Sequence, residues 1–204
     1  MTHSFLHAEG DAPSKAAILE RALELFVRDG LCETSIRDIA AATGYTNPAL
    51  YKFFEGKDAL ALHLFERCYH HLVTQLEHAQ GAEAPFDAKL AAVLATFLDV
   101  LTAHPSAVLF VQENLRTFWR KLPASARRHS VLGVLRALLE QGQRDGAVRR
   151  DLDVPIALAV MSGTFGQIAR MAYFDELPRP WAAHATTLYQ TFHRAFDAPT
   201  KATR

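Results

Sequence analysis

The segment between residues 34 and 60 constrains the fold more than any other part of the chain, because it reads as two short helices joined by a tight turn. Ile36, Ile39 and Ala40 recur at three- and four-residue spacing and predict one apolar helix face. Gly44 follows this helix, where a left-handed backbone is needed and a missing Cβ atom removes the steric penalty. The spacing is typical of a helix-turn-helix.

Both helices of this motif have recognisable starts. Ser35 or Thr34 is expected to cap the first helix, and Thr46 to cap the second by accepting an amide hydrogen bond. Pro48 falls in the first turn of the second helix, where its missing N–H removes no helical bond. The N-terminal half of that helix, the part that enters a major groove in such motifs, then presents Asn47, Pro48, Ala49, Tyr51 and Lys52. Lys57 lies in the first turn of the next helix, where its ammonium could meet phosphate oxygens.

Over about residues 14 to 62, the strings TSIRDIAAATG, YTNPALYKFF and GKDAL resemble the DNA-binding domain of the TetR family of transcriptional regulators. The resemblance implies that Arg37 and the run from Asn47 to Ala49 reach base edges. It also implies phosphate contacts from Ser35, Thr46, Tyr51, Lys52 and Lys57. Many relatives carry a second aromatic residue or a histidine directly after the tyrosine, where this chain has Lys52, so the base preference does not carry over. The alternative is that these are ordinary solvated residues of a helical bundle, with Tyr51 hydrogen-bonded inside it.

Charge places a limit on how the chain could bind DNA. Lys plus Arg and Asp plus Glu both number 22, so no global basic field attracts nucleic acid. Within residues 11 to 60 the acidic side chains even outnumber the basic ones, eight to six. DNA affinity is therefore expected to depend on placed contacts as well as on counterion release, with a dimer supplying cations at each half-site.

The rest of the chain is predicted to be all-α, with about nine helices in all. We expect a flexible tail over residues 1–13, a three-helix DNA-binding domain over 14–60 and a C-terminal bundle for ligand binding and dimerisation over 61–204. The predicted helices cover 14–30, 57–80, 86–103, 106–120, 125–145, 154–174 and 181–196. The most apolar of these, 154–174, is interrupted by Pro155, Gln167 and Arg170, so no membrane span is expected.

No catalytic, metal or cofactor site is predicted. Cys32 and Cys68 are far apart, form neither a metal motif nor a disulfide framework, and are expected to be buried thiols in a reducing cytoplasm. Several histidines fall on the predicted helix 57–80, but His63 and His70 are seven residues apart, whereas a helix-borne metal site prefers ligands three or four apart.

Dimerisation is expected through the last two helices. Small residues at helical spacing, Ala159, Ser162, Gly163 and Gly166, would form a flat strip on which another backbone can lie, with Leu188, Phe192 and Phe196 on the final helix. The dimers of the TetR family support this interpretation, while the alternative is core packing within one chain. Two reading helices related by a twofold axis would bind a palindrome with half-sites about 34 to 36 Å apart.

The central bundle combines bulky apolar side chains with sparse polar ones, a mixture that can line a ligand pocket or simply fill a core. The candidates for ligand contact are Phe97, Phe118, Trp119, Phe165 and Tyr173. The apolar excess favours a hydrophobic or aromatic effector. Three classes of function follow in order of support: a ligand-responsive repressor, a DNA-binding protein without an effector, and a helical enzyme or lipid carrier, for which no catalytic set is present.

Overall fold

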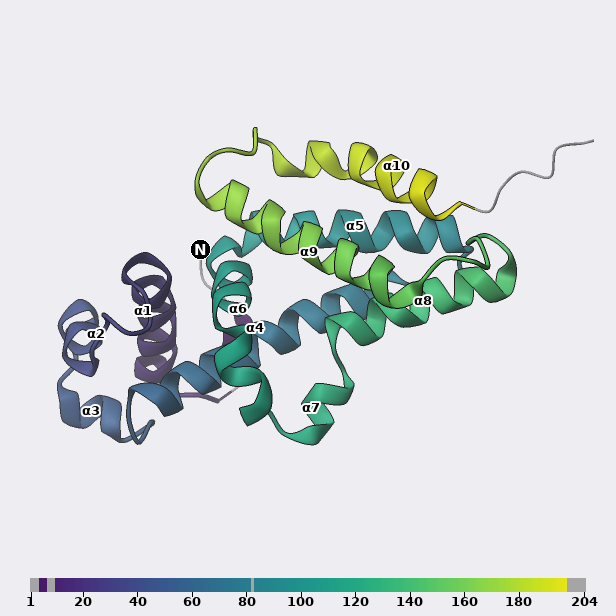
Figure 1. Ribbon diagram of the computed structural model, residues 1–204. Coiled ribbons are helices and arrows are strands. Elements are labelled where there is room, and N and C mark those ends of the chain that lie inside the picture. The colour runs from purple at the N-terminus through teal and green to yellow at the C-terminus, as the bar shows by residue number, and fades with distance from the viewer. Residues whose placement is uncertain (1–3, 7–9, 82, 198–204) are drawn as a thin grey trace, which may run out of the picture. The chain divides into compact units, whose positions relative to one another are not determined.

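The computed structural model describes residues 4–6, 10–81 and 83–197 (Figure 1), and the regular structure in these ranges is helical. The α-helices are α1 Pro13–Asp29, α2 Ile36–Thr43, α3 Asn47–Tyr51, α4 Lys57–Ala79, α5 Phe86–Ala103, α6 Pro105–Phe118, α7 Ala124–Arg128, α8 Val131–Asp145, α9 Val154–Tyr173 and α10 Ala185–Phe196. Three short 3-10 helices accompany them: η1 Ser4–Leu6, η2 Trp119–Lys121 and η3 Trp181–His184. The predicted all-α class is confirmed.

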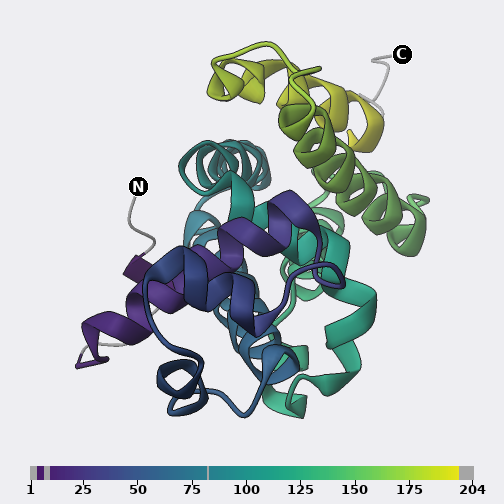
Figure 2. The same cartoon turned by 90° about the vertical axis from the view of Figure 1, so that its left-hand side faces the viewer.

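The chain forms two compact units, one made of residues 1–71 and 106–124 and the other of residues 72–105 and 125–204. The first unit is larger than the predicted domain 14–60 because α6 and the first part of α4 pack into it. Phe26 of α1 stacks on Phe110 of α6 with ring centroids 5.8 Å apart, and Phe65 of α4 lies 5.4 Å from Phe118. In this unit α2 packs against α1 and α3 packs against α2 (Figures 1 and 2).

Part of the expected N-terminal tail is packed rather than loose. Leu6 of η1 has an exposed fraction of 0%, and the ring of Phe5 stacks on His71 of α4 with centroids 4.0 Å apart. Arg67 of α4 donates from Nε to the carbonyl oxygen of Phe5 at 2.8 Å. The prediction of a flexible tail is therefore wrong for residues 4–6, while residues 1–3 and 7–9 lie outside the described residues.

In the second unit, α5 packs against α8, α10 and η3, and α8 packs against α9. Gly142 of α8 permits one of these close approaches, because a Cβ atom there would lie 2.5 Å from Val148 and 2.6 Å from Phe86. The predicted helix 125–145 is in fact two helices. Ser130 interrupts it, since its side chain accepts the backbone N–H of Gly133 and thereby starts α8.

The two cysteines differ in environment. Cys68 is buried, as expected, and burial raises the pKa of its thiol well above the ordinary range. Cys32 is exposed, so the expectation of a buried thiol is wrong there. Its loop follows α1, where the packed apolar side chains belong to the helix and not to the loop.

Within the described ranges, no single helix is long and apolar enough to cross a bilayer, although α5 and α6 taken together reach the length and hydropathy of a span. Among the same residues, no three His, Cys, Asp or Glu side chains gather where they could hold a metal ion.

Candidate nucleic-acid interface

The first helix of the motif, α2, starts with a complete capping box. The Ser35 side chain accepts the backbone N–H of Asp38 at 3.3 Å, and Asp38 accepts the backbone N–H of Ser35 at 2.8 Å. The Ser35 hydroxyl also donates to the Asp38 carboxylate at 2.6 Å. This bond is the larger cause, and the bond from the Ser35 backbone N–H the smaller one, of a pKa of the Asp38 carboxyl below its usual range. Thr34, the other capping candidate, is buried and donates to the carbonyl oxygen of Gly30 at 2.8 Å. Ser35 is therefore the cap, and its hydroxyl is already engaged.

The turn between α2 and α3 has the geometry that the sequence predicts. Gly44 has a φ of 73° in the left-handed region, where only a residue without Cβ is unstrained. Thr46 occupies the N-cap of α3, but its side chain makes no capping hydrogen bond, so the prediction of a hydroxyl cap is wrong. Its backbone carbonyl accepts the N–H of Ala49 at 2.9 Å. Leu50 is buried and anchors α3 inward.

The remaining side chains of the motif are available to a partner. Arg37, Thr46, Pro48, Tyr51 and Lys52 are exposed, and Asn47 and Ala49 are partly exposed. Tyr51 has an exposed fraction of 55%, which favours an outward role over the alternative of a hydrogen bond inside the bundle. The turn and the buried Leu50 thus present one short helix outward, with both amide and basic groups on it.

Lys57 already has protein partners, which a fully solvated lysine would not have. Its ammonium donates to the carbonyl oxygens of Leu31 at 2.8 Å and Cys32 at 3.0 Å. An ammonium has three N–H groups, so one remains for a phosphate. The residue therefore joins the start of α4 to the loop before α2, a role that sequence spacing did not reveal.

The candidate ligand residues do not form one group. Phe97 of α5 and Phe165 of α9 are both buried and stack with ring centroids 4.1 Å apart at 6°. Phe118 is buried on Phe65, and Trp119 meets Tyr69 edge-on in the first unit. Tyr173 is exposed at the end of α9 and contacts Phe174.

Burial also separates the candidate dimer residues. Ala159 and Gly163 of α9 are exposed, while Ser162 and Leu188 are partly exposed. Gly166 is buried, as are Phe192 and Phe196, which stack on each other within the chain. These three cannot face a partner directly. Two apolar residues that the small-residue pattern missed share the open face of α9: Ile156 and Val160, with exposed fractions of 63% and 52%.

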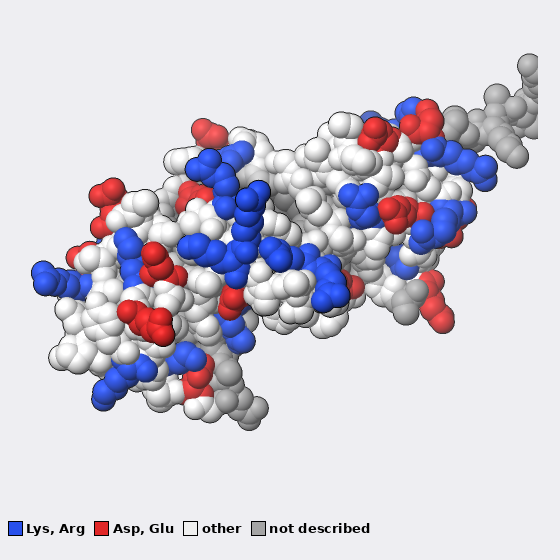
Figure 3. All heavy atoms as spheres, turned by 60° about the horizontal axis from the view of Figure 1, so that its bottom comes forward, with Lys and Arg blue, Asp and Glu red and all other residues white. Residues whose placement is uncertain are grey.

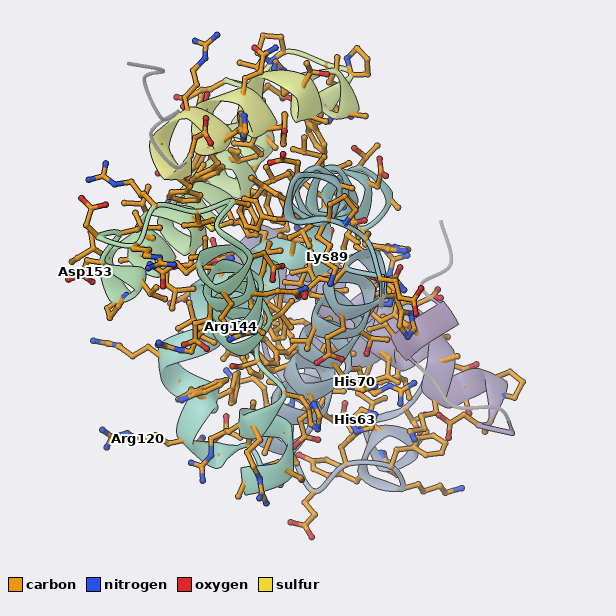
Figure 4. The ribbon with its side chains drawn as sticks, turned by 90° about the vertical axis from the view of Figure 1, so that its right-hand side faces the viewer. His63, His70, Lys89, Arg120, Arg144 and Asp153 are labelled. Atoms are coloured by element: carbon orange, nitrogen blue, oxygen red, sulfur yellow. The ribbon has the colours of Figure 1, made fainter. Side chains whose placement is uncertain are left out.

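Two polar features of the second unit were also missed by the sequence pattern. Lys89 of α5, labelled in Figure 4, is 5% exposed and donates to the Gln141 side chain at 3.0 Å. A second feature is an open hollow of about 430 Å³ that is lined by Glu140, Gln143, Arg144 and Arg150. Neither the lysine nor the hollow resembles the apolar pocket that the composition predicts.

The comparisons with known proteins agree with this geometry. Residues 18–64 match the family model described as bacterial regulatory proteins, tetR family. The HTH-type transcriptional repressor KstR2 of Rhodococcus jostii (strain RHA1) is 26% identical over 163 residues, which cover 76% of this chain and 78% of the relative. A tetR-family regulatory protein from Rhodococcus RHA1 has a similar structure, with a TM-score of 0.80 and 18% identity, over 93% of this chain and 100% of that one. FadR from Bacillus subtilis, solved in complex with stearoyl-CoA, has a TM-score of 0.69 and 19% identity, over 86% of this chain and 96% of that one.

The fold and the exposed reading helix define a helix-turn-helix DNA-binding regulator of transcription. The chain belongs to the TetR family, whose members are regulators and not enzymes.

Proposed function

We propose that this protein is a homodimeric repressor that binds a palindromic operator and leaves it when a small hydrophobic or aromatic effector binds. The observation that carries the proposal is the α2–α3 pair: a left-handed Gly44 and a buried Leu50 hold α3 so that Tyr51 and Lys52 stay exposed. In a helix-turn-helix the N-terminal residues of the second helix meet base edges. Arg37 and the run from Asn47 to Ala49 are accordingly the proposed base readers.

Phosphate contacts would come from the groups around this helix. Thr46 is proposed as one of them because its hydroxyl makes no capping bond in the protein. Tyr51 and Lys52 are exposed beside it, and Lys57 retains one N–H. Ser35 would contribute through the start of α2, although its hydroxyl is shared with Asp38. Such contacts position a protein on the duplex without reading its sequence.

Dimerisation is proposed through the open face of α9. Ile156, Ala159, Val160 and Gly163 recur at helical spacing on that face and are exposed. Ser162 of α9 and Leu188 of α10 are partly exposed and could contribute to the same interface. Exposed apolar side chains in a contiguous row mark an interaction surface more often than isolated ones do. A second copy is the proposed occupant because one reading helix contacts few bases, whereas two related by a twofold axis read both half-sites.

Release by an effector is proposed through α4, which runs from the first unit into the second. The protein would have two conformations that differ in the placement of α4. An effector that binds one of them more tightly shifts the population toward it, which changes the spacing of the two α3 helices in the dimer. The complex of FadR with stearoyl-CoA supports a long-chain acyl thioester as the class of effector to test first.

A test begins with the oligomeric state and a selection from randomised duplex DNA. We expect a dimer in light scattering and enrichment of one inverted repeat, which palmitoyl-CoA then displaces in a mobility-shift assay. A monomer without sequence preference would overturn the proposal. A dimer that binds one repeat and ignores every thioester and apolar ligand would favour the effector-free regulator.

A further inference from the structure

The end of α6 and the following η2 turn carry a basic surface that the DNA-reading motif does not use. Arg116, Arg120 and Lys121 are exposed there, and Lys121 lies with its ammonium 5.3 Å from the Phe118 ring centroid. The sequence has no acidic residue between Glu113 and Glu140, and two further arginines follow on α7. Figure 3 shows a gathering of lysine and arginine side chains on one face, and Figure 4 shows Arg120 extending away from the ribbon.

An aromatic ring stands among these cations. Trp119 is partly exposed, and it meets Tyr69 of α4 edge-on at 5.7 Å and 74°, so its position is fixed while part of its surface is open. Purine rings stack on aromatic side chains, and guanidinium and ammonium groups bind phosphate through charge-assisted hydrogen bonds. A tryptophan flanked by two arginines and a lysine can therefore bind a phosphorylated adenosine, because the ring can stack on adenine while the cations bind phosphate.

We propose that Arg116, Trp119, Arg120 and Lys121 bind the phosphorylated adenosine group of an acyl-coenzyme A effector. This inference rests on the proposed function, because it names the class of the effector. Coenzyme A carries an adenine ring, a diphosphate and a 3′-phosphate, and its acyl chain is the apolar part that the proposed repressor senses. Thioesters of this kind therefore suit the basic surface better than a free fatty acid or a steroid, because neither of these carries phosphate.

The position of the surface links such a ligand to DNA reading. The helix that carries it, α6, packs on α1 through Phe26 and Phe110, and its last turn packs on α4 through Phe65 and Phe118. Helix α1 and the first part of α4, which includes Phe65, belong to the same compact unit as α2 and α3. A ligand held at this end of α6 would therefore bias the helices that support the reading helix.

The test uses the full-length protein with Arg116→Gln, Arg120→Gln and Lys121→Gln combined, and Trp119→Leu as a separate variant. All three glutamines replace exposed side chains, so the fold is expected to persist, which circular dichroism checks. Arg194→Gln, at an exposed position in the last turn of α10, is the matched control. Binding is measured by calorimetry for palmitoyl-CoA, for S-palmitoyl-pantetheine, which lacks phosphate and adenine, and for adenosine 3′,5′-bisphosphate.

We expect the triple variant to bind palmitoyl-CoA on the order of tenfold to hundredfold more weakly, because it loses charge-assisted hydrogen bonds. Its affinity for S-palmitoyl-pantetheine should stay unchanged. Trp119→Leu should weaken both adenosine-containing ligands, and the control should weaken none.

Three results would overturn the inference. If the triple variant binds palmitoyl-CoA as the wild type does while the thioester still releases the operator, the basic surface is not the site and the proposed function stands. If the variant instead loses operator affinity with a smaller salt dependence and keeps its thioester affinity, the cations contact DNA phosphate. If the wild type binds no thioester, both the inference and the proposed effector class fail.

Discussion

The ammonium of Lys57 donates a hydrogen bond to the carbonyl oxygen of Leu31 at 2.8 Å, across 26 positions of sequence. A second bond, to Cys32 at 3.0 Å, completes a bridge between the start of α4 and the loop that precedes α2. Lys57 therefore has two roles to separate: it holds the reading unit together, and it has one N–H left for a phosphate.

Lys57→Met keeps the apolar stem of the side chain and removes the ammonium. We expect unfolding to become easier by about 1 kcal/mol, and binding to every DNA sequence to weaken with a salt slope smaller by about 1. Lys52→Met, at an exposed position in the same motif, is the control and should lower the salt slope without changing stability. Thermal unfolding and binding titrations at several salt concentrations measure both. Unchanged stability in Lys57→Met would show that the hydrogen bonds of Lys57 to Leu31 and Cys32 do not stabilise the fold.

Asn47→Ala tests base reading. Its side chain stands partly exposed at the start of α3, where a carboxamide can pair with one base edge. Loss of that pairing should cost about 1 to 3 kcal/mol on the preferred operator and relax the preference at one base position. Titrations on a panel of operators, each substituted at a single position, give the answer. An equal loss on all sequences would reassign Asn47 to the phosphate contacts.

The helix-turn-helix was predictable because its signals are local. Ser35 and Asp38 are three residues apart and satisfy each other's backbone groups, and Gly44 supplies the left-handed turn a few residues later. These interactions depend on neighbouring residues only, so the sequence contains them in full. The apolar periodicity of α4, α5 and α9 is similarly local, and the predicted and observed ends of α5 coincide.

The features that were missed depend on contacts between distant segments. Leu6 is buried although three residues of η1 are too few to show periodicity. The bridge from Lys57 to Leu31 joins the start of α4 to the loop before α2, and the packing of whole helices decides that these two segments meet. Likewise, Phe192 and Phe196 form an apolar stripe in the sequence, and only the fold decides that the stripe faces its own bundle and not a partner.

The capping box of α2 predicts a pH dependence. Because hydrogen bonds depress the pKa of Asp38 in the folded protein, its ionised form stabilises α2 at neutral pH, and this contribution disappears as pH falls through the depressed pKa. Asp38→Asn should therefore be less stable than the wild type near neutral pH, and the difference should shrink on acidification below the ordinary carboxyl range. Urea unfolding at a series of pH values measures it. A difference that is constant with pH would show that charge at Asp38 does not matter.

The stacked pair Phe97 and Phe165 predicts a coupling in the second unit. Each ring is buried, so replacement of either by alanine should cost about 3 to 5 kcal/mol of unfolding free energy. Because the rings face each other at 4.1 Å, the double variant should lose less than the sum, with a coupling of about 0.5 to 1.5 kcal/mol. Denaturant unfolding of the four proteins completes the cycle. Strict additivity would mean that the two rings act as independent core residues.

Gly163→Glu tests the proposed dimer surface with little risk to the fold of one chain. A Cβ atom at Gly163 meets nothing within 4 Å in its own chain, and glutamate has a higher helix propensity than glycine. If the open face of α9 pairs with a second copy, two new carboxylates would approach each other across the twofold axis, and the dimer should dissociate with a loss of operator affinity. Ala88→Glu, which adds the same charge at an exposed position in the first turn of α5, should remain dimeric. Sedimentation at several concentrations distinguishes the two variants, and a Gly163→Glu protein that stays dimeric would place the interface elsewhere.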